Sequence, residues 1–364
     1  MKKILTLLLA LWMLTGCVAM AAENQLVVGS TTAMSGAFFT DLFGSNTADM
    51  DVRALLHGYN LMSWDHETGT YQINDSVVAG MAVSKDAQNN RVYTFDLYGD
   101  LKFSDGSAIT AKDYAFSILL TASPELAKLG GQSAAAGAIL GMESYQSGKS
   151  SVLRGVRLLS DTQMSITISK AYEPYFYEMA LFDYSPYPIG VLAPGCKVVD
   201  TEKGVGIVNA SGTGDAMFTA DLLQKTILDA ATGYMSHPSV VSGPYTLTSY
   251  DAQRGTASFA INPYYKGNED GEKPTIETIV YRSVANDEAI DLLLSGEVDL
   301  LNKMVAADTV SKGIQSIADQ PFSVANYPRS GLSMISFSCE RQTVSSKAVR
   351  QAIARCFDRD ALVK

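Results

Sequence analysis

Few side chains in this sequence are of the kinds that carry out catalysis. Its three histidines, His57, His66 and His237, are far apart along the chain, and their spacing does not indicate a shared metal site. The chain contains no G-x-S-x-G, no G-x-x-x-x-G-K-S/T and no H-E-x-x-H segment, the signatures of serine hydrolases, phosphate-binding loops and zinc proteases. We therefore expect a protein that is not an enzyme and has no catalytic residue, metal or cofactor.

One cysteine carries a processing signal. Lys2 and Lys3 precede a mainly apolar run, residues 4–13, which is shorter than the about 20 residues of a membrane span but typical of a secretory signal. The run leads to the tetrad LTGC, which ends at Cys17 and looks like a bacterial lipobox. This predicts a signal peptide over residues 1–16, a tether over 17–24 and a lipid on Cys17 that anchors an extracytoplasmic protein to the cell membrane. The alternative is an ordinary signal peptide cut after residue 21 or 22.

The other cysteines do not indicate a disulfide framework. Three cysteines remain, an odd number that cannot all be paired: Cys196, Cys339 and Cys356. They lie far apart in the sequence, with no C-x-x-C pair among them. Cys356 falls on the apolar side of a predicted helix that begins near residue 345, so we expect it to be buried in packing.

Length and charge limit the class of protein. The chain has 364 residues, of which 47% are hydrophobic and 18% charged, and its net charge is -10. This composition is that of a globular protein of roughly two to three domains. An acidic surface argues against a nucleic-acid partner, because binding to phosphates requires a basic face.

Apolar periodicity predicts alternating short strands and helices. Thr110 and Asp113 have the spacing of a capping box, which predicts that a helix begins there. We expect strands over residues 25–30, 91–97, 245–250, 257–261, 276–282 and 298–301, a hairpin over 157–170, and helices over 221–231, over 289–294 and from 345 onward.

Three segments, in this order, resemble the extracytoplasmic solute-binding proteins of family 5, which serve oligopeptide and dipeptide ABC importers. The first is LKFSDGSAITAKDY at residues 101–114. The second runs from SGPY at 242–245 through NPYYKG at 262–267 to LSGEVD at 294–299. The third is VRQAIA at 349–354, followed by DR at 358–359. Local physics explains all three as scaffold, because none supplies a reacting group.

The resemblance implies a periplasmic-binding-protein type II-like fold, with two α/β lobes around a cleft and an inserted α+β domain. Lobe I would comprise residues 25–45 and 186–300, the inserted domain 46–185, and lobe II would begin at 301. In the family the chain continues well beyond the helix at 345–358, so lobe II is expected to be incomplete and the chain truncated. Apolar residues between 349 and 357 would then have few packing partners.

The resemblance also implies a function and a site. We expect a monomer that captures oligopeptides or dipeptides by lobe closure and delivers them to a membrane permease and ATPase. Ser30, Thr31 and Thr32 follow the first strand and are predicted to pair with the ligand, and Asp183 and Tyr184, in a proline-punctuated loop, are further candidates. The alternative is that these hydroxyls only cap local turns.

Three other functions are weighed against peptide capture. The ligand could be nickel, haem or a sugar, since members of the family differ in ligand. The protein could be a tethered surface protein used in adhesion or sensing. It could also be a hydrolase, which an assay for peptide cleavage would reveal.

Overall fold

The computed structural model describes residues 24–65, 67–132, 137–173, 175–317, 320–326 and 334–358. The predicted signal peptide over residues 1–16, most of the tether, Cys17 and His66 lie outside these ranges. The chain divides into two compact units, one that ends at Gly313 and one that begins at Ile314. Each unit is described by itself.

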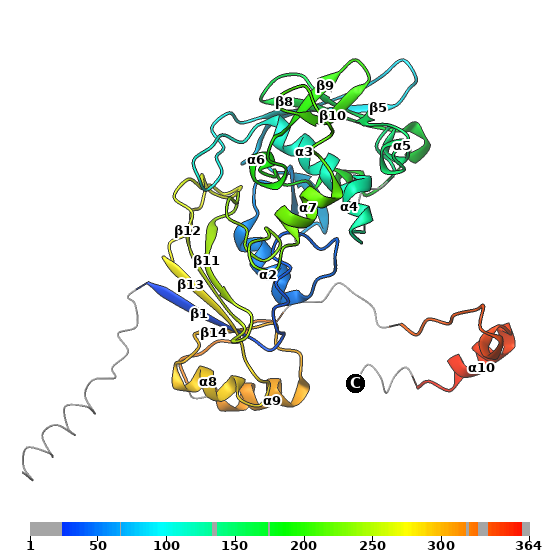
Figure 1. The fold of residues 1–364 in the computed structure, drawn as a ribbon. Helices are drawn as coiled ribbons and strands as arrows, with labels where there is room; N and C mark the ends of the chain where they lie inside the picture. The colour runs from blue at the N-terminus through cyan, green and yellow to red at the C-terminus, as the bar shows by residue number, and fades with distance from the viewer. Residues whose placement is uncertain are drawn as a thin grey trace, which may run out of the picture. The chain divides into compact units, whose positions relative to one another are not determined.

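The first unit contains a five-stranded sheet in which β1 lies between β13 and β14 (Figure 1). β1 runs parallel to both neighbours, whereas the other neighbouring strands are antiparallel. The sheet therefore joins the start of the described chain to segments about 250 residues later. In spatial order the strands are β11 (Tyr245–Asp251), β12 (Thr256–Ile261), β13 (Thr278–Ser283), β1 (Gln25–Ser30) and β14 (Leu300–Asn302).

Helices cover both faces of this sheet. Successive side chains of a strand point to opposite faces, so Val27 and Val28 belong to different cores. Val28 packs in one core with Val52 of α2 (Thr47–Leu56), and Val27 packs against another that contains Ala289 of α8 (Ala289–Ser295). Figure 1 shows α2 on one side of the sheet and α8 on the other. The result is an α/β/α arrangement around β1.

A larger core is built on three smaller antiparallel sheets. They have the strand orders β4-β5-β8-β7, β6-β10-β9 and β2-β3. The strands are β2 (Met62–Asp65), β3 (Thr70–Ile73), β4 (Val78–Lys85), β5 (Arg91–Leu97), β6 (Val152–Leu153), β7 (Val156–Leu158), β8 (Gln163–Ile168), β9 (Cys196–Thr201) and β10 (Gly204–Asn209). The helices of this part are α3 (Ala111–Thr121), α4 (Pro124–Lys128), α5 (Met142–Gln146), α6 (Ile189–Leu192) and α7 (Ala220–Ile227).

Most predicted elements are present. The strand over residues 91–97 and the hairpin that contains β7 and β8 are confirmed. α3 begins at the predicted capping box, where the Asp113 carboxylate accepts hydrogen bonds from the Thr110 amide at 2.8 Å and from its hydroxyl at 2.9 Å. α7 ends at Ile227, earlier than predicted, because the Asp229 carboxylate accepts the amides of residues 231 and 232 and turns the chain.

The predicted boundaries between lobe I and the inserted domain stay a prediction. Packing assigns two segments differently from the predicted residue ranges. α2, placed in the inserted domain from the sequence, contributes Val52 and Leu56 to the core of the five-stranded sheet. Residues 192–234, placed in lobe I, contribute Val205 and other side chains to the larger core.

Two of the recognised sequence motifs meet at the junction of these cores. A Cβ on Gly243 would lie 2.5 Å from the carbonyl carbon of Leu56, so the end of α2 can approach this position only because it is glycine. The buried Asn262 side chain donates to the Gly243 carbonyl at 2.8 Å, and the Ser104 amide donates to the Val241 carbonyl at 2.8 Å. The motif residues therefore hold the scaffold together.

The second unit contains η3 (Gln342–Val344) and α10 (Lys347–Arg355). α10 is amphipathic, as predicted, but none of its residues is buried. Cys356 is exposed, so the prediction that it is buried was wrong. Its neighbours on the apolar side share this exposure, with 41% for Val349 and 42% for Phe357, because no described segment packs over them.

No helix in the described ranges is long and apolar enough to span a membrane.

The acid stability of this fold should depend on His57, which follows α2 and donates from Nε2 to the Phe38 carbonyl at 2.9 Å. Burial, together with the positive charge of Arg53, lowers the pKa of His57 from 6.5 to about 4. Between these values the unfolded chain binds a proton that the folded chain does not, so the free energy of unfolding should fall with pH by about 2 kcal/mol between pH 7 and pH 4.5. Urea unfolding at both pH values measures it. In His57→Gln this part of the loss should disappear. If the free energy of unfolding of His57→Gln falls between the two pH values as much as that of the wild type, the prediction is contradicted.

Candidate ligand-binding site

The carboxyl ends of β1, β13 and β14 meet at one edge of the five-stranded sheet. Ser30 pairs in register with Ser283 on one side and with Asn302 on the other. In open α/β sheets, ligands bind outside the carboxyl ends of the parallel strands. This place is therefore the candidate site. It comprises residues 30–36, 46–51, 283 and 302–303 and is called the carboxyl edge.

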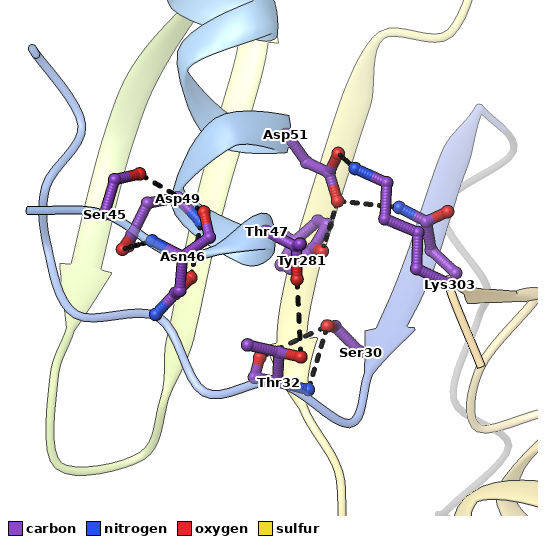
Figure 2. Close-up of polar contacts among 10 residues, drawn as sticks. Ser30, Thr32, Ser45, Asn46, Thr47, Asp49, Asp51, Tyr281 and Lys303 are labelled. Carbon is purple, nitrogen blue, oxygen red and sulfur yellow. Dashed lines mark hydrogen bonds and ion pairs between the residues drawn. The ribbon is translucent and has the colours of Figure 1, made fainter. Parts of the chain in front are cut away.

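The Ser30 side chain is engaged within its own loop. It is 3% exposed, and its hydroxyl accepts from the Thr32 amide and donates to the Thr32 carbonyl, each at 3.2 Å. The Thr47 hydroxyl, at the start of α2, lies 3.4 Å from the Thr32 hydroxyl (Figure 2). Ser30 thus makes the turn-capping contact that was the alternative to ligand binding. A ligand role for these hydroxyls stays a prediction.

Three backbone amides beyond Ser30 have no acceptor in the described part of the chain. The amides of Thr31, Ala33 and Met34 donate to no other residue in the described part of the chain. The Thr31 side chain likewise makes no hydrogen bond there. Backbone donors are nearly always satisfied in folded proteins, and the carbonyl groups of an extended ligand could accept from donors of this kind, as an added strand does.

Asp49 holds this loop against α2. It is fully buried, and one oxygen of its carboxylate accepts from the Ser35 amide at 2.8 Å and the Gly36 amide at 3.2 Å. The other oxygen accepts from the Ser35 hydroxyl at 2.6 Å and the Asn46 amide at 3.3 Å. Asn46 in turn caps α2, because its Oδ1 accepts a hydrogen bond from the Asp49 amide at 3.0 Å. The sequence analysis missed this pair, although the N-x-x-D spacing before an apolar run was a signal of a capping box.

Asp51, two residues further along α2, joins the helix to the ends of two strands. One oxygen of its carboxylate accepts from the Tyr281 hydroxyl at 2.9 Å and from Asn302 Nδ2 at 2.8 Å. The other forms an ion pair with Lys303 (Figure 2). Burial, reinforced by the charge of Asp51, raises the pKa of Tyr281 to about 12. Nothing in the local sequence of these residues predicts this cluster, because its members come from three separate segments.

Asp183 and Tyr184 lie elsewhere. Asn60 donates to the Asp183 carboxylate at 2.7 Å, and the amide of residue 61 donates to the Tyr184 carbonyl at 3.1 Å. Asn60 follows the C-terminal end of α2, whereas Thr32 contacts its first residue, and a ten-residue helix is about 15 Å long. Burial raises the pKa of Asp183, with the Asn60 hydrogen bond opposing it, and raises that of Tyr184 to about 12. The structure therefore does not bring these two residues together with Ser30, Thr31 and Thr32.

A separate hollow of about 540 Å³ lies beside β9 and the turn between β7 and β8. The ionised groups around it are paired with each other: Lys112 with Asp161 at 2.7 Å and Arg157 with Asp200 at 2.9 Å. In the described ranges, no group of three or more His, Cys, Asp or Glu side chains could hold a metal ion. We assign no ligand to this hollow.

Comparison with known sequences identifies relatives of the chain. Residues 76–364 match the family described as bacterial extracellular solute-binding proteins, family 5 middle. The chain is 28% identical, over 233 residues, to the oligopeptide-binding protein OppA of Lactococcus lactis subsp. lactis strain IL1403. That match covers 63% of this chain and 32% of the relative, so the chain spans about a third of the relative's length.

Comparison with solved structures shows the fold. Lactococcal OppA, complexed with an endogenous peptide in the closed conformation, has a TM-score of 0.58 at 20% identity, over 81% of this chain and 48% of that one. NikZ from Campylobacter jejuni, in complex with Ni(L-His), has a TM-score of 0.59 at 15% identity, over 93% and 54%. The predicted α/β fold class is confirmed for the part of these folds that the chain covers.

The buried carboxylate of Asp49 should be the main determinant of order in the loop. Asp49→Ala leaves four donors without an acceptor and should lower the free energy of unfolding by about 3 kcal/mol, as measured by urea unfolding. Asp41→Ala is the matched control, because that side chain is exposed and accepts no hydrogen bond from a described residue. Its effect should stay within about 0.5 kcal/mol. Equal stability of the two variants would show that Asp49 does not anchor the loop.

Proposed function

The chain belongs to family 5 of the bacterial extracellular solute-binding proteins, and from this premise we propose that it captures short peptides for an ABC importer. The family consists of binding proteins rather than enzymes. The observation that best supports peptide as the ligand is that the amides of Thr31, Ala33 and Met34, on the carboxyl edge, donate to no acceptor in the described part of the chain. Oligopeptides or dipeptides would be bound outside the cytoplasm and passed to a membrane permease and its ATPase.

The mode of binding follows from the donors that the loop offers. An extended peptide can place its carbonyl groups opposite these amides, so affinity comes from its main chain and many side chains are tolerated. The loop is already held in one conformation by the Ser30 turn and the Asp49 carboxylate. Little conformational entropy is then lost when the peptide binds.

Capture would be completed by closure of a second lobe over the peptide. A ligand that touches both lobes stabilises the closed state by its differential affinity for that state. We keep Thr31 and Thr32 as direct contacts, and Asp183 and Tyr184 as a separate candidate contact, because they lie at the other end of α2. The protein would act as a monomer, with no catalysis, no cofactor and no nucleic-acid partner.

Calorimetry on the chain with a pool of di- to pentapeptides tests this function. We expect heat of binding with the pool, and about fivefold weaker binding in Ala33→Pro, which removes one amide donor. The matched control is Ala252→Pro, in the turn between β11 and β12, where the amide donates to no described residue and the side chain is exposed. Heat with a nickel–histidine complex, haem or a sugar, and none with any peptide, would contradict peptide capture.

We also propose that the protein is anchored by a lipid on Cys17, on the strength of the LTGC tetrad and the preceding apolar run. When the chain is produced from Met1 in bacteria fed an alkyne-tagged fatty acid, the tag should appear on it in the membrane fraction. Cys17→Ser should lose the tag and Cys339→Ser should keep it, because Cys339 is an exposed cysteine outside the tetrad. An untagged wild-type chain, or a tagged Cys17→Ser chain, would refute the anchor.

A further inference from the structure

The charged side chains of the carboxyl edge are not equivalent. Among residues 30–36, 46–51, 283 and 302–303, the charged ones are Asp49, Asp51 and Lys303. Asp49 accepts four hydrogen bonds. Asp51 accepts two hydrogen bonds and forms an ion pair with Lys303. The buried Asp49 carboxylate is saturated by its four donors, and the charge of Asp51 is already balanced by the ammonium group of Lys303. The two acids therefore do not form a site for an ammonium group.

Lys303 is the one cation among these charged residues, and the bonding capacity of its ammonium group is not filled. An ammonium group has three N–H donors, and in the described part of the chain only Asp51 accepts from this one. Its side chain is 32% exposed, so the remaining donors can be reached from solvent. This group can accept an anion without losing its existing partner.

The backbone places Lys303 where a ligand would lie. It follows Asn302, which pairs in register with Ser30, in the same way as Thr31 follows Ser30. Its φ is 57°, a left-handed conformation that is unusual for a residue with a side chain. Strained backbone of this kind persists where the surroundings hold it, and here the side chain returns to Asp51 on α2 (Figure 2).

We propose that Lys303 binds a carboxylate of the ligand at the carboxyl edge, and that Asp51 is the positioning residue that holds its ammonium group there. The chain would then prefer peptides that present a carboxylate at this point, either the C-terminal group or an acidic side chain. This inference rests on the proposed peptide-binding function and names the ligand group that its site selects. An ion pair that only fastened α2 to the sheet would not respond to the charge of the ligand.

Calorimetry with three probes tests the proposal: tetraalanine, its C-terminal amide, and the amide of Ala-Ala-Glu-Ala. The wild-type chain should bind at least one of the two peptides that carry a carboxylate about tenfold more tightly than the neutral amide, and the one it favours identifies the source of the carboxylate. Lys303→Met should remove this preference, so that the peptides with a carboxylate bind no more tightly than the neutral amide. Lys303→Arg, which keeps the charge, should retain most of the preference.

Two further variants separate ligand recognition from stability. Lys312→Met is the matched control, because Lys312 forms a comparable ion pair with Asp291 at 3.0 Å, away from the carboxyl edge, and should leave the preference intact. Asp51→Asn should reduce the preference for a carboxylate, because the ammonium group loses the partner that positions it. Urea unfolding confirms that each variant is folded before it is titrated.

The outcomes distinguish this inference from the function on which it rests. Equal binding of all three peptides by the wild-type chain would overturn the role of Lys303 while leaving peptide capture standing. A preference that survives in Lys303→Met would do the same. If the wild-type chain binds none of these probes or of the peptide pool, the proposed function fails, and this inference fails with it.

Discussion

The parallel pairing of β1 with β13 and β14 is the constraint on which the rest of the structure depends. It joins residues 25–30 to strands about 250 positions later, and it places three carboxyl ends side by side. Because side chains alternate along β1, one strand supplies both the core under α2 and the core under α8. Without this pairing there would be no shared edge at which a loop, a helix and a lysine could meet.

α2 converts that edge into a site because it is fixed at both ends. Its first turn is tied to the loop after β1 by Asn46 and Asp49, whose buried hydrogen bonds are costly to break. Its last turn rests on Gly243, where any side chain would collide with the helix backbone. Contacts thus hold the helix at both ends, and Asp51 between its ends meets Tyr281 and Lys303.

Local features were predictable where their cause lay within a few residues. The capping box at Thr110 and Asp113 and the hairpin of β7 and β8 both follow from short-range geometry. Cys356 was misjudged because an apolar stripe predicts a buried face only if some segment packs over it. That condition is a property of the packed chain and not of the stripe.

The candidate site shows the same division. The sequence by itself determined the family motifs, the strand that ends at Ser30 and the loop of small polar residues that follows it, since these are local patterns of residue type. Only the tertiary structure decided that the Ser30 hydroxyl bonds within its own turn, that nearby amides have no acceptor in the described ranges, and that Asp183 lies beyond the far end of α2. It also brought Asp51 and Lys303 together. Hydrogen bonds and ion pairs act over about 3 Å in space, and neither residue type nor sequence spacing records which distant segments come that close.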